Sequence, residues 1–566
     1  MSTETIQRIA TLCTETLGVD TIRPEVSLVE QGASSMRLMQ LVALVYEEFD
    51  VIVDLSEVMG SEVTLAWIAG VVEQRRGGGG HDAVPEGPPG ATRSDALGAA
   101  PGAPVPLSDL QLAFWDMRLY GPAMTAYNEG VSHLVEGDLD IAVCRKVLSE
   151  LVATQPALRS AYLELNGVPV QREVPFAEIA DALRIEVVDL SSHEDPMAEC
   201  AAQHRAMYAT QFDLSSPPCF RVVLWRVGER RWVVSWVVYH IVTDWWAVDV
   251  LRRSAATVYR AMMMPGGTSP QEPPRIVPLD PHAGTAFTAD DRAYWLSKFE
   301  TPPRPVDLSR RPRPAIKTYV GEMYVEELAR VSAGQLDGLR ERLSVTMSSL
   351  TFSAFCILLA ATSGEDDVTV GVPFLNRQHA SVQDAVGLFV NSLPVRLNVD
   401  GAMDVANYVR ACHGELLEAF RHGRYPSYRL IREAKTPNRL NRAPLYEQLF
   451  SYYENTVVNV ACTQTQLRVT EIELPRGTSK YDLSLFVTRS GDRLSCKAEY
   501  ATALFAERDV ADLVSRYQFV LERMIADPAA AVRELVSATR ERAAQAGREP
   551  SAARGAGTLE HPARRV

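Results

Sequence analysis

The sequence lacks any CxxC pair, because its eight cysteines are scattered at positions 13, 144, 200, 219, 356, 412, 462 and 496. This spacing argues against a zinc ribbon and against a dithiol redox motif. In a chain of 566 residues, scattered thiols fit a reducing compartment better than a disulfide scaffold. We therefore expect a cytoplasmic protein.

Positive charge and long apolar runs are also scarce. The chain has 57 Lys+Arg against 71 Asp+Glu, a net charge of −14, which argues against a nucleic-acid or membrane binder that works mainly through charge. The N-terminus, MSTETIQRIATLCTE, has no basic start followed by an apolar core, so it does not resemble a secretory signal. Apolar runs such as 233–238 are far shorter than the ~20 residues that a membrane helix needs. We expect no nucleic-acid partner and no membrane span.

Several catalytic motifs are missing as well. We find neither a Ser/Thr/Gly-rich phosphate loop of the adenylating type nor the G-x-S-x-G of a thioesterase. The ten histidines are widely dispersed and form no cluster with metal-ligand spacing. The sequence therefore predicts no metal site and no capacity to activate its own substrate.

Composition divides the chain. Residues 77–104 are dominated by Gly, Ala and Pro and are predicted to form a flexible linker. Residues 548–566 are predicted to be a disordered tail. The remaining units are 1–76 and 105–547, and the small one has twelve acidic against five basic residues, half of the net negative charge.

Apolar spacing predicts the fold class of each unit. Residues 6–17, 36–49 and 65–72 have helical periodicity, which predicts an all-helical small unit. In the large unit, 231–239 (RWVVSWVVY) and 368–372 have the length and composition of strands, whereas 246–262 and 348–362 have helical spacing. The large unit is therefore predicted to mix helices and strands. Cys356, inside the last of these helices, is predicted to be a buried core thiol.

A serine precedes the second helix of the small unit. Gly32 permits a tight turn, and Ser35 then stands at the helix start. The hydroxyl can be a plain helix cap, but a helix N-terminus also favours a negatively charged group. A short, acidic helical unit with G-x-x-S followed by apolar residues resembles a peptidyl carrier protein of four helices. The resemblance implies that Ser35 carries 4′-phosphopantetheine; Ser34, which replaces the usual Asp or His, is the competing position.

A histidine follows the apolar strand of the large unit, in Tyr239-His240-Ile-Val-Thr-Asp244-Trp245-Trp246. A histidine at a strand end can face a cleft and assist proton transfer from an attacking amine or alcohol. An isolated H-x-x-x-D is weak evidence, and a structural histidine is the simpler interpretation of these residues alone.

Other segments of the large unit resemble the condensation domains of nonribosomal peptide synthetases. They occur in the family's order: PLSDLQLAFW (106–115) with AYN (126–128), QPALR (155–159), FDLSSP (212–217), GVPFLNR (371–377), VGLFVNSLPVR (386–396), NRAPL (441–445) with FSYY (450–453), and YDL (481–483). The resemblance implies two lobes of the chloramphenicol acetyltransferase type, expected at 105–275 and 276–547, with a tunnel between them. It also implies a donor thioester that enters from one side and an acceptor from the other.

The resemblance further implies the roles of site residues. The family motif is His-His-x-x-x-Asp-Gly, so His240 corresponds to the active-site histidine and Asp244 to an aspartate that forms a structural ion pair with an arginine. Arg159 and Arg377 are the two candidate partners. Asn391 belongs to a motif that we expect at the tunnel.

Two motif positions depart from the family. Tyr239 replaces the first histidine, and Trp245 replaces the glycine. The first loss is tolerable, because related acyltransferases use a single H-x-x-x-D. The indole of Trp245 adds bulk that can narrow the tunnel or reshape its acceptor side.

The implied reaction is amide formation between an acyl or aminoacyl thioester at Ser35 and an amine held near His240. Ester formation with an alcohol is an alternative, and the rival hypothesis is a non-catalytic condensation-like domain that recruits partner proteins. No Glu-Gly-His-Gly-Arg-like segment or paired aspartate motif is present, which argues against epimerisation and heterocyclisation. The implied partners are a phosphopantetheinyl transferase, an adenylating enzyme or upstream module that loads the carrier in trans, and an acceptor that is a free amine or bound to another carrier.

Overall fold

We analysed a computed structural model of the chain. It describes residues 3–17, 21–28, 63–77, 102–263, 287–377, 380–434, 439–454 and 467–546, with single positions or pairs at 31, 33, 38, 41–42, 44–45, 48–49, 51, 53, 58 and 436. The expected division between the lobes at 275/276, most of the predicted linker and the whole predicted tail lie outside these residues.

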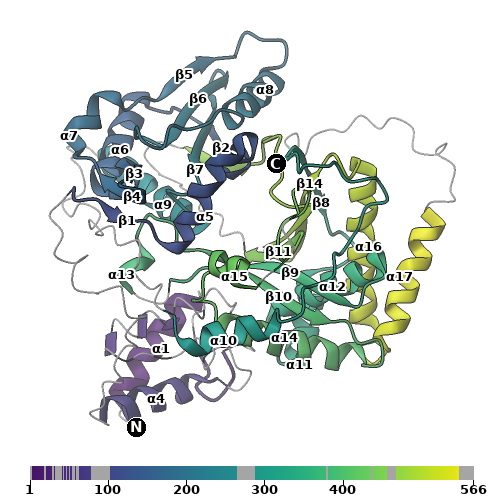
Figure 1. Ribbon diagram of the computed structural model, residues 1–566. Helices are drawn as coiled ribbons and strands as arrows, with labels where there is room; N and C mark the ends of the chain where they lie inside the picture. The colour runs from purple at the N-terminus through teal and green to yellow at the C-terminus, as the bar shows by residue number, and fades with distance from the viewer. Residues whose placement is uncertain are drawn as a thin grey trace.

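The small unit is helical, as predicted. Helices α1 (Thr3–Leu17) and α4 (Leu65–Gly77) pack against each other (Figure 1), and they include the predicted segments 6–17 and 65–72. Half of the predicted helix 36–49 lies outside the described residues. Its described positions Leu38, Leu41, Val42, Val45 and Phe49 are buried, so this segment contributes to the core of the small unit.

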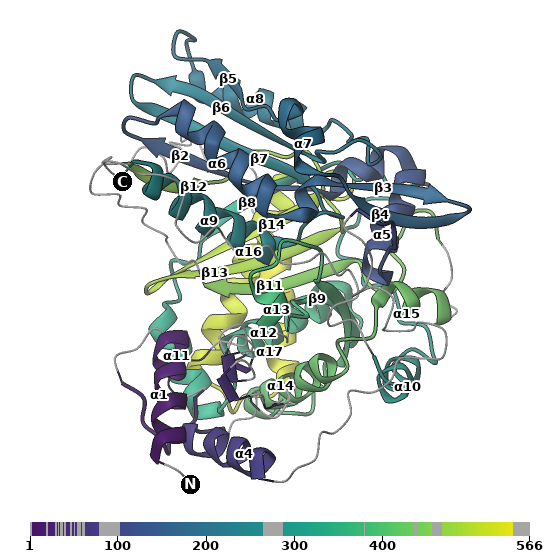
Figure 2. The same ribbon diagram turned by 90° about the vertical axis from the view of Figure 1, so that its left-hand side faces the viewer.

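The first lobe is organised around a five-stranded sheet in the order β12-β2-β7-β6-β5 (Figure 2). Its strands are β12 (Arg468–Ile472), β2 (Asn128–Glu136), β7 (Arg231–Tyr239), β6 (Phe220–Gly228) and β5 (Glu186–Asp189). Strand β7 coincides with the predicted strand 231–239. It is central and mostly buried because β2 and β6 flank it on both sides. Strand β12 pairs with β2, although it comes from far later in the chain.

The second lobe is organised around a six-stranded sheet in the order β10-β9-β11-β13-β14-β8. Its strands are β10 (Asn391–Asn398), β9 (Asp367–Phe374), β11 (Gln448–Glu454), β13 (Leu483–Ser490), β14 (Arg493–Ala501) and β8 (Gly321–Glu327). Helix α12 (Met347–Ser363) is almost entirely buried between this sheet and α14 (Val405–Arg421), α16 (Glu507–Ala526) and α17 (Val532–Ala546). The predicted helix 348–362 and strand 368–372 are both confirmed, and Cys356 is a fully buried thiol whose pKa is raised by burial.

Smaller elements complete both lobes. The first lobe also contains β1 (Val105–Pro106), α5 (Asp109–Met117), η1 (Arg118–Tyr127), α6 (Ile141–Thr154), η2 (Pro156–Arg159), β3 (Ser160–Leu165), β4 (Val168–Glu173), α7 (Phe176–Ile179), η3 (Ala180–Ala182), α8 (Pro196–Tyr208) and α9 (Trp245–Met263). The second contains α10 (Ala289–Lys298), α11 (Ala333–Leu343), α13 (Ala380–Gln383) and α15 (Ser427–Glu433). The large unit is therefore a two-lobed α/β structure, as predicted.

Among the described helices, none alone is long and apolar enough to cross a membrane, and the pair α11 and α12, bent by 98°, meets the length and composition criteria only when taken together. Within the same described residues, no group of three or more His, Cys, Asp or Glu side chains is placed to hold a metal ion.

Candidate active site

The candidate active site begins where β7 ends. The backbone N–H of His240 donates to the carbonyl of Tyr127 (2.9 Å), which extends the pairing between β2 and β7 by one residue. The chain then turns through residues 240–243 and starts α9. The imidazole lies 4.6 Å from the ring of Phe114, between ring centroids, and only 13% of its side chain is exposed. The strand end and the aromatic contact therefore hold His240 in one orientation.

The contacts of His240 define its protonation. Its Nδ1 lies 2.7 Å from the carbonyl oxygen of Thr243, and a carbonyl can only accept, so Nδ1 carries the proton. Burial lowers the pKa of His240, while the Thr243 carbonyl and the charge of Asp244 oppose that shift. The neutral imidazole is therefore favoured near pH 7, and its Nε2 keeps a lone pair that can accept a proton.

A carboxylate faces that lone pair. In an antiparallel pair, opposite residues point to the same face of the sheet, and the pairing of Glu129 with Val238 puts Glu129 diagonally across from His240. Oε1 of Glu129 lies 3.6 Å from Nε2 of His240. We call these two atoms the reaction face.

Cations of the second lobe hold this carboxylate. Lys480 Nζ donates to Oε1 of Glu129, and Arg476 Nη1 lies 3.5 Å from Oε2. The backbone N–H of Lys480 donates to Glu499 on β14 (3.0 Å). Burial lowers the pKa of Lys480, and Glu499 opposes this. The reaction face is thus positioned by contacts from both lobes.

Sequence reasoning missed Glu129, Lys480 and Arg476. The available signal for Glu129 was a charged residue directly after the AYN segment, and the structure places it as the second residue of β2. Only the pairing of β2 with β7, more than a hundred residues later, places it beside His240. Lys480 directly precedes the YDL segment, but the sequence does not indicate which side chain it meets.

Asp244 forms a second set of contacts four residues after His240. Its Oδ1 accepts from the backbone of Ala247 (2.8 Å), which caps α9, and from Nη2 of Arg377 (2.9 Å). Its Oδ2 accepts from the backbone N–H groups of Phe389 (2.9 Å) and Val390 (3.2 Å). We call Asp244 and Arg377 the lobe junction, because this buried pair connects the start of α9 to the chain that links β9 and β10.

The two candidate arginines have different partners. Arg377 pairs with Asp244 and also donates to the carbonyls of Val382 (2.5 Å) and Ala385 (2.8 Å). Arg159 instead pairs with Glu173 (2.5 Å) and donates to two carbonyls at the end of α6. The expectation that Arg159 could be the partner of Asp244 is therefore wrong, since its guanidinium stabilises the C-terminus of a different helix.

The two departures from the family motif have opposite environments. Tyr239 is fully buried, and its hydroxyl donates to the carbonyl of Phe114 (2.7 Å), so it fixes α5 against the end of β7. Trp245 is 51% exposed, and its ring centroid lies 5.4 Å from that of Tyr453 on β11. The indole therefore spans from the first lobe to the second beside the site.

Asn391 is saturated by structural contacts. Its Nδ2 donates to the carbonyls of Gly423 and Tyr425 (both 2.8 Å), and its Oδ1 accepts from the N–H (3.1 Å) and hydroxyl (2.8 Å) of Ser427. These bonds leave no donor for a substrate, so its contacts do not support the expected place at the tunnel. Asn391 joins β10 to the segment between α14 and α15.

Ser35, the predicted attachment residue, lies outside the described residues, as does Ser34. The described positions on either side, Ala33 and Leu38, are both buried.

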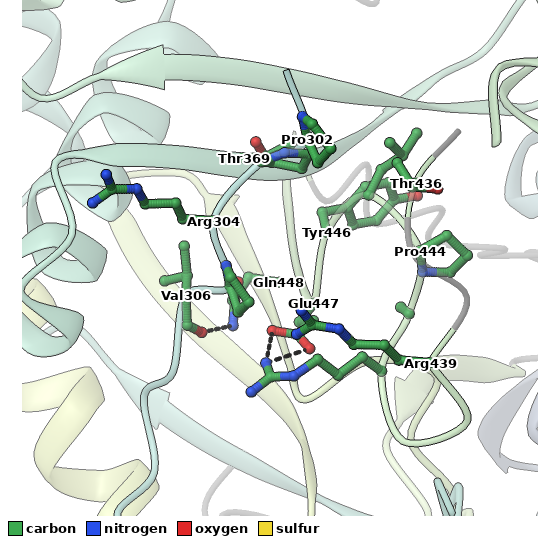
Figure 3. Close-up of a pocket in the computed structure, with 15 residues that line it drawn as sticks. Pro302, Arg304, Val306, Thr369, Thr436, Arg439, Pro444, Tyr446, Glu447 and Gln448 are labelled. Atoms are coloured by element: carbon green, nitrogen blue, oxygen red, sulfur yellow. Dashed lines mark hydrogen bonds and ion pairs between the residues drawn. The ribbon is translucent and has the colours of Figure 1, made fainter. Parts of the chain in front are cut away.

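A separate pocket of about 110 Å³ lies in the second lobe (Figure 3). Residues 302–306 and 436–448 form most of its wall, and Glu447 there pairs with Arg442 (2.7 and 2.8 Å). The residues of the reaction face are not among those that line it. Tyr446, one wall of the pocket, lies 3.1 Å from Tyr481 between hydroxyl oxygens.

Comparison with known families assigns both units. The profile of the condensation domain matches residues 103–545, and that of the phosphopantetheine attachment site matches residues 7–72.

Curated relatives share the chain at low identity. It is 26% identical over 533 residues to tyrocidine synthase 2 of Brevibacillus parabrevis, which covers 93% of this chain and 14% of that protein. It is also 26% identical over 515 residues to surfactin synthase subunit 2 of Bacillus subtilis (strain 168), covering 91% of this chain and 14% of that protein. The chain thus spans only a small part of these relatives.

Solved structures share the fold of the large unit. The first condensation domain of the calcium-dependent antibiotic synthetase, in complex with a substrate analogue, matches with a TM-score of 0.64 and 24% identity over 76% of this chain and 98% of that one. The X-domain from teicoplanin biosynthesis matches with a TM-score of 0.65 and 21% identity over 77% and 98%.

Proposed function

The chain belongs to the condensation-domain family, with a phosphopantetheine carrier domain ahead of it as in nonribosomal peptide synthetases, and we propose that it forms an amide bond between a carrier-bound acyl group and an amine. The observation that carries this proposal is the reaction face. A neutral, oriented imidazole presents its Nε2 lone pair beside a carboxylate, where side chains of both lobes meet.

The arm supplies one thing to this chemistry: when attached at Ser35, it presents the acyl group as a thioester. The residues of the chain do the rest. His240 accepts a proton from the attacking amine at Nε2, while the Thr243 carbonyl holds Nδ1–H and keeps the ring oriented. Holding two reactants together between the lobes also contributes, since effective molarities of about 10⁵ M are reached in well-oriented systems.

The lobe junction keeps the site in shape. Asp244 starts α9 directly behind the His240 turn, and its ion pair with Arg377 brings in the second lobe. We assign a positioning role to Asp244 and Arg377, because their polar atoms form hydrogen bonds to each other and to the backbone. Trp245, half exposed beside Tyr453, is assigned to the tunnel wall.

The partners follow from what this chain holds. We propose that a phosphopantetheinyl transferase primes Ser35 and that an adenylating enzyme or upstream module loads it in trans. The acceptor arrives as a free amine or on another carrier. The acidic carrier domain suits docking to basic patches on such proteins, and a cytoplasmic location fits this chemistry.

The test is intact-protein mass spectrometry of the primed, acyl-loaded chain after incubation with amines, with wild type beside His240→Ala. We expect the acyl group to leave the wild-type chain as an amide, and to stay on the variant. If neither free nor carrier-bound acceptors unload the wild type, the domain recruits partners without condensing them, and the proposal is wrong.

A further inference from the structure

We propose that Glu129 binds the acceptor and makes the site selective for primary amines over alcohols and secondary amines. This inference rests on the proposed condensation function and specifies its acceptor class. It follows from the geometry of the reaction face and from the charges that hold Glu129.

The reaction face consists of two hydrogen-bond acceptors without a donor between them. Nε2 of His240 carries a lone pair because Nδ1 holds the proton, and Oε1 of Glu129 is a carboxylate oxygen. The two atoms are 3.6 Å apart, beyond a hydrogen bond, and two acceptors cannot bond each other. A group that satisfies both must donate two hydrogens from one atom or from adjacent atoms.

Side chains of the second lobe hold the Glu129 carboxylate but do not fill all of its hydrogen-bond acceptor sites. Lys480 donates to Oε1 and Arg476 lies beside Oε2, so the charge of Glu129 is balanced and its orientation is held. A carboxylate oxygen has two lone-pair sites. Oε1 can therefore keep its bond to Lys480 and accept a second hydrogen from the side of His240.

The backbone around Glu129 leaves little freedom for another arrangement. A Cβ at the next residue, Gly130, would lie 2.0 Å from the carbonyl oxygen of Trp236 and 2.6 Å from the hydroxyl of Tyr208. The two strands approach closely there, and Nη2 of Arg476 also donates to the Gly130 carbonyl (3.3 Å). The backbone position of Glu129, diagonally across from His240, is therefore fixed.

A primary amine matches this pair of acceptors. As the nitrogen attacks the thioester carbonyl, the C–N bond forms, the C–S bond breaks, and one N–H proton passes to Nε2 and then to the departing sulfur. The second N–H stays on the nitrogen, points to Oε1 throughout, and remains in the amide. An alcohol or a secondary amine has one hydrogen on the attacking atom, which His240 takes, so Oε1 of Glu129 receives no hydrogen bond from the acceptor.

The Glu129 carboxylate also acts on the positive charge of the attacking nitrogen, whether the amine is primary or secondary. Charge develops on that nitrogen as the C–N bond forms and before the proton has moved. A fixed carboxylate beside it stabilises the transition state more than the ground state, which raises the rate and not only the affinity.

The experiment compares three acceptors that differ only in the attacking group: the glycyl, N-methylglycyl and glycolyl thioesters of N-acetylcysteamine. Each is offered to the primed, acyl-loaded chain, as wild type, Glu129→Ala, Glu129→Gln and the control Glu136→Ala. Glu136 lies on the same strand β2 and its carboxylate is 3.6 Å from Arg231, away from the site. Thermal unfolding of each variant shows whether it has folded.

We expect the wild type and Glu136→Ala to prefer the glycyl acceptor. Glu129→Ala should lower the glycyl rate about 10- to 100-fold and the other two rates much less, since a hydrogen bond to a charged group contributes about 1.5–3 kcal/mol. Glu129→Gln keeps an acceptor oxygen, so its rate with the glycyl acceptor should lie between those of the wild type and Glu129→Ala. A folded Glu129→Ala that slows all three acceptors equally, or keeps the wild-type preference, overturns the inference. A wild type that forms no product with any of them contradicts the proposed condensation itself.

Discussion

The reaction face and the lobe junction share one short segment, since His240 of the first and Asp244 of the second lie four residues apart, but their polar atoms are used in opposite ways. At the lobe junction, both carboxylate oxygens of Asp244 accept from an arginine or from backbone N–H groups, and the side chain is fully buried. At the reaction face, Nε2 of His240 and Oε1 of Glu129 face each other without bonding. The protein saturates both carboxylate oxygens of Asp244, whereas Nε2 of His240 and one lone-pair site on Oε1 of Glu129 stay available to a ligand.

This difference separates positioning from chemistry within one short motif. A saturated, buried carboxylate contributes to stability only as long as both partners remain, because removing one leaves a buried charge. A buried acceptor that the protein leaves open, such as Nε2 of His240, costs some stability and is retained where function uses it.

The largest expected effect is the loss of activity in His240→Ala. Removing the proton acceptor should lower condensation by about 10²- to 10⁴-fold, while the melting temperature changes little because the side chain makes one hydrogen bond. Product formation and thermal unfolding are measured on the same samples. If His240→Ala loses stability in proportion to its activity, His240 has a structural role like that of Asp244 and Arg377.

Asp244→Ala should have the opposite profile. It leaves the guanidinium of Arg377 buried without its counter-charge, so we expect the free energy of unfolding to fall by about 3–5 kcal/mol. Urea unfolding of the large unit within the full chain measures it. The double variant Asp244→Leu with Arg377→Met should recover part of that loss, and full additivity of the two single changes would contradict the pairing.

The effect of pH on the condensation rate should be smaller than the effects of these two substitutions. The neutral form of His240 accepts the proton, and burial lowers its pKa below the ordinary value of about 6.5. Activity should therefore be on a plateau at pH 7 and fall only when the pH drops below 6.5, where the imidazole becomes protonated. Single-turnover rates across pH 5–8, corrected for thioester hydrolysis in His240→Ala, test this. A half-maximal point above 6.5 would contradict it.

The smallest effect on folding is expected for Trp245→Ala. The indole is half exposed and contacts Tyr453, so the free energy of unfolding should change by at most about 1 kcal/mol. The rate with bulky acyl donors should rise relative to that with acetyl, because the tunnel wall loses its bulk. Equal rate changes for large and small donors would exclude Trp245 from selectivity; Trp245→Phe serves as the matched control.

Much of the fold is readable in the sequence because its signals are local. Strand 231–239 is a run of apolar residues bounded by charge, and helix 348–362 is apolar on all sides, as a buried helix must be. The carrier core follows from the same periodicity. The motif segments likewise identify His240 and Asp244 as candidate site residues, since the spacing of the two residues in the chain is part of the family motif.

The site needed more than local signals. The choice of Arg377 over Arg159 depends on which of two loops, separated by over two hundred residues, passes the start of α9. The burial of Tyr239 and the exposure of Trp245 depend on α5 and β11, which the motif does not contain. Asn391 shows the limit most clearly: it belongs to a family motif, yet its amide is consumed by the segment between α14 and α15.

Periodicity, composition and motif spacing are properties of neighbouring residues, and they are enough to predict the two units, their fold classes and the candidate histidine. What His240 faces depends instead on contacts between remote segments. Glu129 reaches it through the register of β2 on β7, and Lys480 and Arg476 reach Glu129 from the other lobe. Strand register and lobe packing set these distances through contacts between remote segments, and no local pattern encodes them.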